Sequence, residues 1–375
     1  MAEKLLCEEG GCVNSAKGKA QECLNMELEA SKAGHFDTAL GKLQEGRDLL
    51  KEGGLELWLQ LSNGLAETYC QAARWQDCVS LCKLTLTSWD HSPHHFELLQ
   101  TLFYLTQACY MLDLEDQGYA AVEEWSGKLV ADTARSKCVL LCTQANKLKC
   151  QNKERSAAWL YEKALQWDSS PSYVTICSRL YLASVYSSLD KYEKAEEAFL
   201  TTLDLFSVHF PKSYAFALCH NQLAALYKKV KRLQDAEKQY LLAKEFYIAH
   251  FPHTEGHTNC LRGLGEVYEK MKRLGDAEEQ FLEADQLCSA YLPQSRTHLE
   301  CLTDLGGLYV RMDRKKEAVA QYLLTLQLYS VYFPQNESYV WCSLHLGLIY
   351  DSLDKSGKAI KQFKLAIQLC STNFP

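Results

Sequence analysis

The sequence predicts an all-α fold, a right-handed superhelical solenoid of antiparallel helix pairs. Two observations predict it. Leucine, a small residue, tyrosine, alanine and an aromatic residue recur in phase along the second half of the chain. Five of the seven prolines keep the same step, each 41 residues after the one before: Pro211, Pro252, Pro293, Pro334 and Pro375. A fixed period of this length is typical of stacked repeats, in which each unit contacts only its neighbours.

A leucine, a small residue and a tyrosine mark the first helix of each unit. In one unit they are Leu264, Gly265 and Tyr268, at i, i+1 and i+4, which places them on one apolar stripe of a helix. We expect the small residue to let a neighbouring helix approach closely. The tyrosine of this pattern recurs as Tyr186, Tyr227, Tyr268, Tyr309 and Tyr350.

A second helix follows a short polar turn in each unit. It places an alanine nine residues after the tyrosine and an aromatic residue four further on, as in Ala277 and Phe281. A Phe-Pro or Leu-Pro pair ends the unit, because proline cannot continue a helix and disfavours helix in the residue before it. Neither helix can bury its stripe alone, so the stripes must be covered by the adjoining pair.

This pattern resembles the tetratricopeptide repeat family. The 41-residue spacing is more like the arrays of kinesin light chains and nephrocystin-type proteins than like the 34-residue form. The N-terminal half is degenerate but keeps step, and the third repeat, Phe103 to Tyr119, fits least well. The residues that carry the resemblance best are Leu261, Leu264, Gly265, Tyr268, Ala277, Phe281 and Ala284, followed by Pro293.

The phasing predicts the domain organisation. We expect residues 1–19 to form a flexible N-terminal extension and residues 20–375 to form a single solenoid. No linker rich in Pro, Gly or Ser interrupts the array. About nine repeats are predicted, with starts near residues 20, 59, 100, 138, 176, 217, 258, 299 and 340.

Composition narrows the function. The net charge of −7 disfavours a globally basic nucleic-acid binder. No run of 18 apolar residues is present and the N-terminus lacks a signal-peptide core, so we expect no membrane span and a cytoplasmic location, with nucleus and cilium left open. The 17 cysteines at helical spacings favour reduced, buried thiols over a disulfide framework.

No motif for catalysis or a cofactor stands out. Phosphate-binding loops, GxSxG and HExxH are absent. Cys78 and Cys82, and Cys138 and Cys142, have the i, i+4 spacing of zinc ligands, but a buried helical stripe has the same spacing. The histidine cluster of His91, His94 and His95 falls in a turn. We expect no enzyme activity, no cofactor and no metal. Core packing is also the favoured interpretation of Cys219, Cys260, Cys301 and Cys342.

The resemblance implies that the first helices line a concave groove that holds a segment of a partner protein. We expect a non-catalytic adaptor whose partner segment is acidic or polar. Asparagine would bond the peptide backbone, and Lys or Arg would pair acidic groups. The candidate partner-binding residues are Asn221, Gln222, Lys229, Asn259, Arg262, Lys270, Arg311, Trp341 and His345.

Alternatives remain at three places. Basic turns such as Lys231-Arg232 and Lys272-Arg273 form a ladder that could bind RNA, although we favour a protein ligand. No three repeats reproduce the family's carboxylate clamp, so chaperone tails are not expected. At the last repeat we expect Phe363, Ala366, Ile367 and Cys370 to be left partly uncovered. A partner or second copy covers them, the chain is longer, or Lys361, Lys364 and Gln368 suffice as a polar cap; we favour one of the first two.

Overall fold

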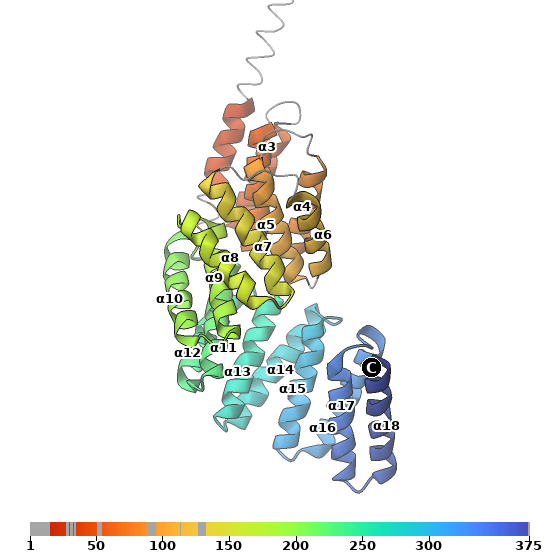
Figure 1. The fold of residues 1–375 in the computed structure, drawn as a ribbon. Helices are drawn as coiled ribbons and strands as arrows, with labels where there is room; N and C mark the ends of the chain where they lie inside the picture. Colours follow the sequence, from red (N-terminus) through yellow and green to blue (C-terminus); the bar gives the residue numbers. More distant parts are fainter. Residues whose placement is uncertain are drawn as a thin grey trace, which may run out of the picture. The chain divides into compact units, whose positions relative to one another are not determined.

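The computed structural model describes residues 16–27, 30, 33, 35–50, 55–88, 95–112, 114–126 and 133–373. Within these ranges the chain consists of helices joined by short turns, without a strand. Consecutive helices pack as antiparallel pairs (Figure 1). The predicted all-α architecture of stacked helix pairs is therefore confirmed.

The chain divides into two compact units, residues 1–226 (unit 1) and residues 227–375 (unit 2). The division falls within α11. Unit 1 opens with a helix over residues 16–27. Its further helices are α2 (Phe36–Asp48), α3 (Leu55–Gln71), α4 (Trp75–Thr87), α5 (His95–Met111), α6 (Glu115–Ser126), α7 (Ala134–Cys150), α8 (Glu154–Trp167), α9 (Tyr173–Ser188), α10 (Tyr192–His209) and the first part of α11 (Tyr214–Lys229).

Unit 2 continues the alternation of first and second helices. The predicted repeat starts fall a few residues inside the first helix of each pair. The predicted extension over 1–19 lies mostly outside the described residues, and the prediction of one continuous array over 20–375 stays a prediction. The helices of unit 2 are α12 (Leu233–His250), α13 (Glu255–Lys270), α14 (Leu274–Tyr291), α15 (Arg296–Arg311), α16 (Lys315–Tyr332), α17 (Glu337–Asp351) and α18 (Ser356–Asn373).

The turn inside each pair has a fixed backbone conformation. One residue adopts a left-handed conformation, and the next N–H bonds back to a carbonyl in the last turn of the first helix; Arg232 N lies 2.8 Å from Tyr227 O. This is a C-terminal helix cap of the kind that uses a left-handed residue. At five turns that residue recurs every 41 positions, with φ between 55° and 65°: Asp190, Lys231, Lys272, Asp313 and Asp354.

The repeated small residue lies where the two helices of a pair cross. A Cβ atom added at Gly265 of α13 would lie 2.6 Å from the ring of Phe281 on α14. Gly347 meets Phe363 at the same calculated distance of 2.6 Å. The predicted close approach is therefore confirmed. The second helices also end as predicted, since α12 stops at His250, two residues before Pro252.

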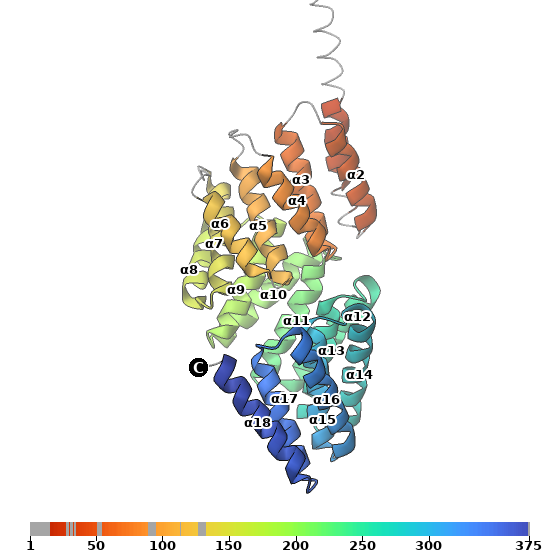
Figure 2. The same ribbon diagram turned by 90° about the vertical axis from the view of Figure 1, so that its right-hand side faces the viewer.

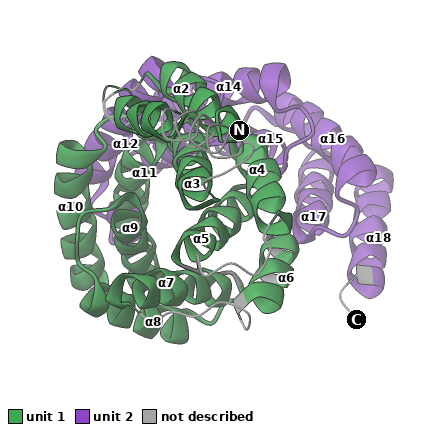
Figure 3. Cartoon of the chain, turned by 90° about the horizontal axis from the view of Figure 1, so that it is seen from above, with its two compact units in different colours: residues 1–226 green, residues 227–375 purple. Residues whose placement is uncertain are grey.

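The first helices of unit 1 lie inside a ring formed by the unit itself (Figure 3). The unit's early and late segments touch, because Lys212 Nζ donates to Ala33 O at 2.6 Å and the rings of Trp75 and Tyr214 lie 5.3 Å apart. Helix α5 is buried from Leu98 to Cys109 except at Gln100, which is partly exposed. A helix in that position needs apolar residues all round. This explains why the third repeat fits the amphipathic pattern least well.

Candidate functional site: the inner face of unit 2

The first helices α15 and α17 lie on the inner side of unit 2, and α16 and α18 lie outside them (Figure 3). Helix α13 is the first helix of the preceding pair and contacts α15. These three helices carry charged and solvent-accessible side chains, whereas α5 and α9 of unit 1 are mostly buried. We define the inner face of unit 2 by the exposed and partly exposed residues of these helices: Asn259, Arg262, Glu266, Lys270, Glu300, Asp304, Arg311, Trp341, His345 and Leu348.

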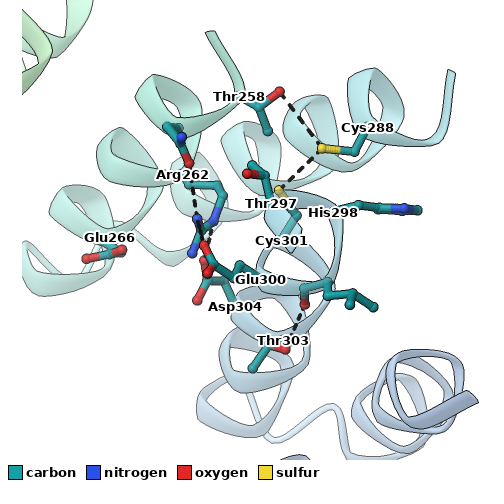
Figure 4. A network of polar contacts seen from close by, with 12 residues as sticks. Thr258, Arg262, Glu266, Cys288, Thr297, His298, Glu300, Cys301, Thr303 and Asp304 are labelled. Carbon is teal, nitrogen blue, oxygen red and sulfur yellow. Dashed lines mark hydrogen bonds and ion pairs between the residues drawn. The ribbon is translucent and has the colours of Figure 1, made fainter. Parts of the chain in front are cut away.

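Arg262 is at the centre of an ion-pair network that joins α13 to α15 (Figure 4). Its Nη1 lies 2.6 Å from Glu300 Oε2 and its Nε lies 2.8 Å from Asp304 Oδ2. Burial opposes the charged form of Arg262, but these two acids outweigh it and raise the pKa of the guanidinium. Burial raises the pKa of Asp304 to about 6, although Arg262 acts against that rise. The network therefore loses a negative charge in mildly acidic solution.

Other charges of the inner face also pair between repeats. Lys228 Nζ lies 2.7 Å from Glu266 Oε2, and Arg311 pairs with Glu269. Lys270 is exposed at the end of α13. Much of the charge on this face is therefore neutralised within the chain, and the pairs fix the spacing of successive first helices.

Helix α17 adds an apolar stripe to this face. Trp341, His345 and Leu348 lie at i, i+4 and i+7, on one side of the helix. The side chains of Trp341 and Leu348 are 53% and 57% exposed. His345 stacks on the ring of Tyr322, with centroids 5.9 Å apart, and burial together with Arg311 lowers its pKa. An exposed tryptophan beside a leucine is the kind of group that anchors a protein partner.

The predicted binding residues fall into three groups. Asn259, Arg262, Lys270, Arg311, Trp341 and His345 lie on the inner face of unit 2. Asn221 and Gln222 lie in the part of α11 that belongs to unit 1, where Asn221 Oδ1 is buried without a hydrogen-bond partner. Lys229 is exposed at the end of the same helix. Their role in binding stays a prediction.

Sequence reasoning missed two features of this face. It treated Arg262 and Arg311 as open to a ligand, whereas the structure pairs both with acids of this chain. It also overlooked Leu348, although the seven-residue step from Trp341 was a signal for it.

The arginines of the basic turns are engaged within unit 2. Arg273 lies over the ring of Tyr268 at 4.2 Å and bonds Asp276 and Glu237. Arg314 repeats this arrangement on Tyr309, Glu317 and Glu278. Each of these arginines therefore connects its own repeat to the preceding one.

The cysteines of the sequence motifs are core residues. Cys78, Cys82, Cys138 and Cys142 are buried, as are Cys260, Cys301 and Cys342. Cys260 Sγ lies 3.2 Å from Tyr240 O, and the two sulfurs of Cys288 and Cys301 lie 3.9 Å apart (Figure 4). Over the described ranges, no three His, Cys, Asp or Glu side chains are grouped to hold a metal ion. His91 and His94 lie outside those ranges.

The helices differ from membrane-spanning segments. None of those in the described part of the chain combines the length and the apolar character that crossing a bilayer requires.

Comparisons with known proteins give a family match to one repeat and a likeness in fold. A family model for the tetratricopeptide repeat matches residues 343–373. No curated protein matches the chain. In the solved APC/C hetero-tetramer Cut9-Hcn1, a chain matches with a TM-score of 0.59 at 15% identity, over 89% of this chain and 57% of that one. At this identity the likeness shows the fold alone.

Two further solved structures are similar over a shorter stretch. BtubC from P. vanneervenii has a TM-score of 0.48 at 17% identity, over 64% of this chain and 91% of that one. PilF from Pseudomonas aeruginosa has a TM-score of 0.46 at 17% identity, over 62% of this chain and 92% of that one.

Proposed function

We propose that the chain is a tetratricopeptide repeat protein and acts as a non-catalytic scaffold. Its ligand is a segment of another protein, which binds along the inner face of unit 2. One observation carries the proposal. This face exposes Trp341 and Leu348 beside ordered charges, whereas α5 and α9 of unit 1 are mostly buried.

The face favours a ligand of a particular chemistry. The stripe of Trp341, His345 and Leu348 suits an apolar or aromatic anchor residue of the partner. Arg262 is paired with two acids and Arg311 with Glu269, so the exposed Lys270 is the better placed cation for an acidic group of the partner. The bound segment is then polar or acidic with one apolar anchor, in the cytoplasm or in a compartment continuous with it.

The basic turns favour a protein ligand over RNA, because their arginines already pair with acidic residues of this chain. Arg232, Arg273 and Arg314 each bond acidic residues of this chain and lie over a tyrosine. RNA binding depends on cations that are available to phosphates. A labelled single-stranded RNA should therefore stay unbound at low salt.

Affinity capture with matched variants tests the proposal. The wild-type chain and the double variant Trp341→Ala, Leu348→Ala are each incubated with native extract, and the bound proteins are identified by mass spectrometry. Both side chains are more than half exposed, so the substitutions should leave the fold intact. A partner of the inner face is captured by the wild type and weakened about tenfold or more in the variant, as calorimetry on the purified pair would measure.

The control variant is Leu323→Ala, Val331→Ala, which removes exposed apolar residues from α16. It should bind like the wild type. Equal capture by all three proteins would contradict the assignment of the inner face. Lys270→Glu tests the acidic character of the ligand; charge reversal at Arg262 would not, because it breaks the ion pairs between α13 and α15.

A further inference from the structure

A cleft opens in unit 1 between the second helices α8 and α10. Its floor is α9, which packs on both of them and lies between them in the view of Figure 2. The cleft has a volume of about 250 Å³ and is open to solvent. Three apolar and three charged side chains contribute to its lining: Leu165, Leu182 and Ala198, with Arg179, Lys194 and Glu197. A concave surface that combines apolar side chains with a few charges is typical of a small-ligand site.

The corresponding space in unit 2 is closed by a bridging side chain. Lys244 of α12 reaches across to α14, where its Nζ lies 2.8 Å from Gln280 Oε1 and 2.6 Å from Glu283 Oε2. These bonds occupy the space between the two second helices. The lysine and its two partners therefore hold this part of unit 2 together and leave no comparable opening there.

The cleft in unit 1 is open because its walls carry shorter or apolar residues at the same positions. Leu165 follows the last repeat alanine of α8 as Lys244 follows that of α12. The positions of Gln280 and Glu283 are held, two repeat periods earlier, by Ala198 and Thr201. A leucine cannot donate to the opposite helix, and neither wall has an amide or carboxylate to accept from it. The space between α8 and α10 is thus left unfilled.

The charge of the cleft also differs from that of its counterpart. Arg179 on the floor takes the position of Leu261, which is fully buried, and Lys194 takes the position of Asp276. Arg179 itself is only partly buried. Among the described residues that line the cleft, Glu197 is the single acid. Two cations and one acid leave the cleft with one positive charge in excess.

The guanidinium of Arg179 is available to a ligand. Within the part of the chain that the structure describes, it makes no ion pair and no hydrogen bond, whereas Arg262 of unit 2 is held by two acids. A guanidinium presents a planar fork of N–H donors that fits a carboxylate with two parallel bonds. Lys194 supplies the second cation, and its Nζ lies 5.9 Å from the ring centre of Tyr186, another residue of the lining.

We propose that the cleft between α8 and α10 binds a small organic acid, in which one carboxylate is attached to an apolar or aromatic body. The carboxylate pairs with Arg179 and lies beside Lys194, and the body packs on Leu165 and Leu182. A single negative charge balances the excess of the cleft, whereas a phosphate monoester would bring nearly two charges close to Glu197. The cleft belongs to unit 1, so the inference does not depend on the function proposed for the inner face of unit 2.

The probe is 4-(trifluoromethyl)benzoate, which is titrated with the full chain while its fluorine NMR signal is recorded. Saturable binding with a Kd in the millimolar range or tighter is expected, because the contact consists of one ion pair and one partly buried ring. The neutral control is 4-(trifluoromethyl)benzamide, which has the same body without the charge. It should bind about tenfold or more weakly than the benzoate.

Three variants locate the binding. Arg179→Leu introduces the residue that unit 2 has at this position, and it should weaken binding of the benzoate about tenfold or more. The triple variant Leu165→Lys, Ala198→Gln, Thr201→Glu rebuilds the bridge of unit 2 and should abolish binding although Arg179 is retained. Arg155→Leu removes an exposed arginine of α8 outside the cleft and should bind like the wild type. Circular dichroism checks that each variant is folded.

Each outcome bears on one part of the proposal. Absence of saturable binding, or equal affinity of the wild type and folded Arg179→Leu, overturns it. Unchanged affinity of the folded triple variant places the probe outside the cleft and overturns it as well. Equal binding of the benzamide overturns the role of the carboxylate. Displacement of the benzoate by inorganic phosphate at a lower concentration than the benzoate itself requires would assign the cleft to phosphate instead.

Discussion

Units 1 and 2 are built from the same kind of helix pair, but the inner sides of these pairs differ in burial. In unit 1 the first helices α5 and α9 are mostly buried, and polar side chains of the interior bond one another: Thr101 Oγ1 donates to Asn63 Oδ1 at 2.8 Å, and Tyr161 bonds Asn146. In unit 2 the first helices keep an accessible face on which charges pair between repeats. The repeat period therefore determines how neighbours stack, whereas the residues on the inner side determine whether the stack encloses a core or presents a surface.

Charge follows the same division. Residues 1–226 contain 21 Lys and Arg against 29 Asp and Glu, and residues 227–375 contain 19 against 18. The net charge of −7 therefore comes from unit 1, while unit 2 is close to neutral. A long-range attraction between the whole chain and an acidic ligand is absent, so recognition by unit 2 depends on local contacts.

The largest effect is expected from the enclosed core. Phe103→Ala removes a fully buried ring from α5 and should destabilise unit 1 by about 3–5 kcal/mol, since it leaves a cavity that the ring of helices cannot fill. Trp341→Ala on the inner face of unit 2 is the control and should change stability by about 0.5 kcal/mol or less. Hydrogen exchange measured at increasing urea concentration reports the stability of each unit separately. A similar loss in both variants would contradict the contrast between them.

A carboxyl in the interior of unit 1 gives the next largest effect. Glu67 accepts hydrogen bonds from Tyr104 OH at 2.5 Å and Gln71 Nε2 at 3.2 Å, and burial raises its pKa to about 7. Because the folded state disfavours the ionised form of Glu67, the free energy of unfolding falls as the pH rises from the pKa of this carboxyl in the unfolded chain to about 7. Glu67→Gln should remove that loss and stabilise unit 1 by about 2 kcal/mol at pH 8.

Unfolding at pH 4 and pH 8 measures this change. The stabilisation should be seen at pH 8 and disappear at pH 4, where the wild-type carboxyl is protonated in both states. Glu300→Gln in unit 2 is the control, and it should destabilise the chain because it removes a partner of Arg262. A gain at both pH values for Glu67→Gln would show that ionisation is not its cause.

Repeats were predictable because their signals are local. Gly265 and Tyr268 lie four residues or fewer apart in sequence, and Pro252 stops a helix wherever it occurs. The closure of unit 1 was not predictable, because Lys212 and Ala33, or Trp75 and Tyr214, meet only through the summed rotation of several repeats. The candidate site could be located because the position of a residue along its helix is local information. The pairing of Arg262 with Glu300 and Asp304 could not be predicted, because these acids come from the next repeat.

The turns of the two units give a smaller effect. Ala73, between α3 and α4, has a left-handed φ of 56°, and Lys272 in unit 2 has a φ of 65°. This conformation costs a non-glycine residue about 1 kcal/mol, whereas glycine adopts it without that cost. Ala73→Gly should stabilise unit 1, and Lys272→Gly unit 2, each by about 0.5–1 kcal/mol in thermal unfolding. Ala72→Gly is the matched control and should destabilise, since Ala72 is not left-handed.

The smallest expected effect concerns the pKa values of two histidines of unit 2 that occupy equivalent positions. His257 and His298 lie 41 residues apart, and their Nδ1 atoms lie 2.7 Å and 3.1 Å from the carbonyl oxygens of Pro252 and Pro293. Burial lowers the pKa of His257, and nearby Lys244 acts in the same direction. Burial also opposes the charged form of His298, but Asp285, at 3.2 Å from Nε2, outweighs it and raises the pKa.

Opposite shifts have opposite consequences for stability. His298 contributes stability below its unfolded pKa, which is lost as the pH rises through its folded pKa; His257 favours the neutral form, so its contribution is lost as the pH falls. NMR titration of the two imidazoles should place His298 above His257, and Asp285→Asn should lower the pKa of His298 and leave His257 unchanged. Equal titration of both rings in the wild type would mean that the residue at this one position, Asp285 or Lys244, does not control the histidine of its repeat.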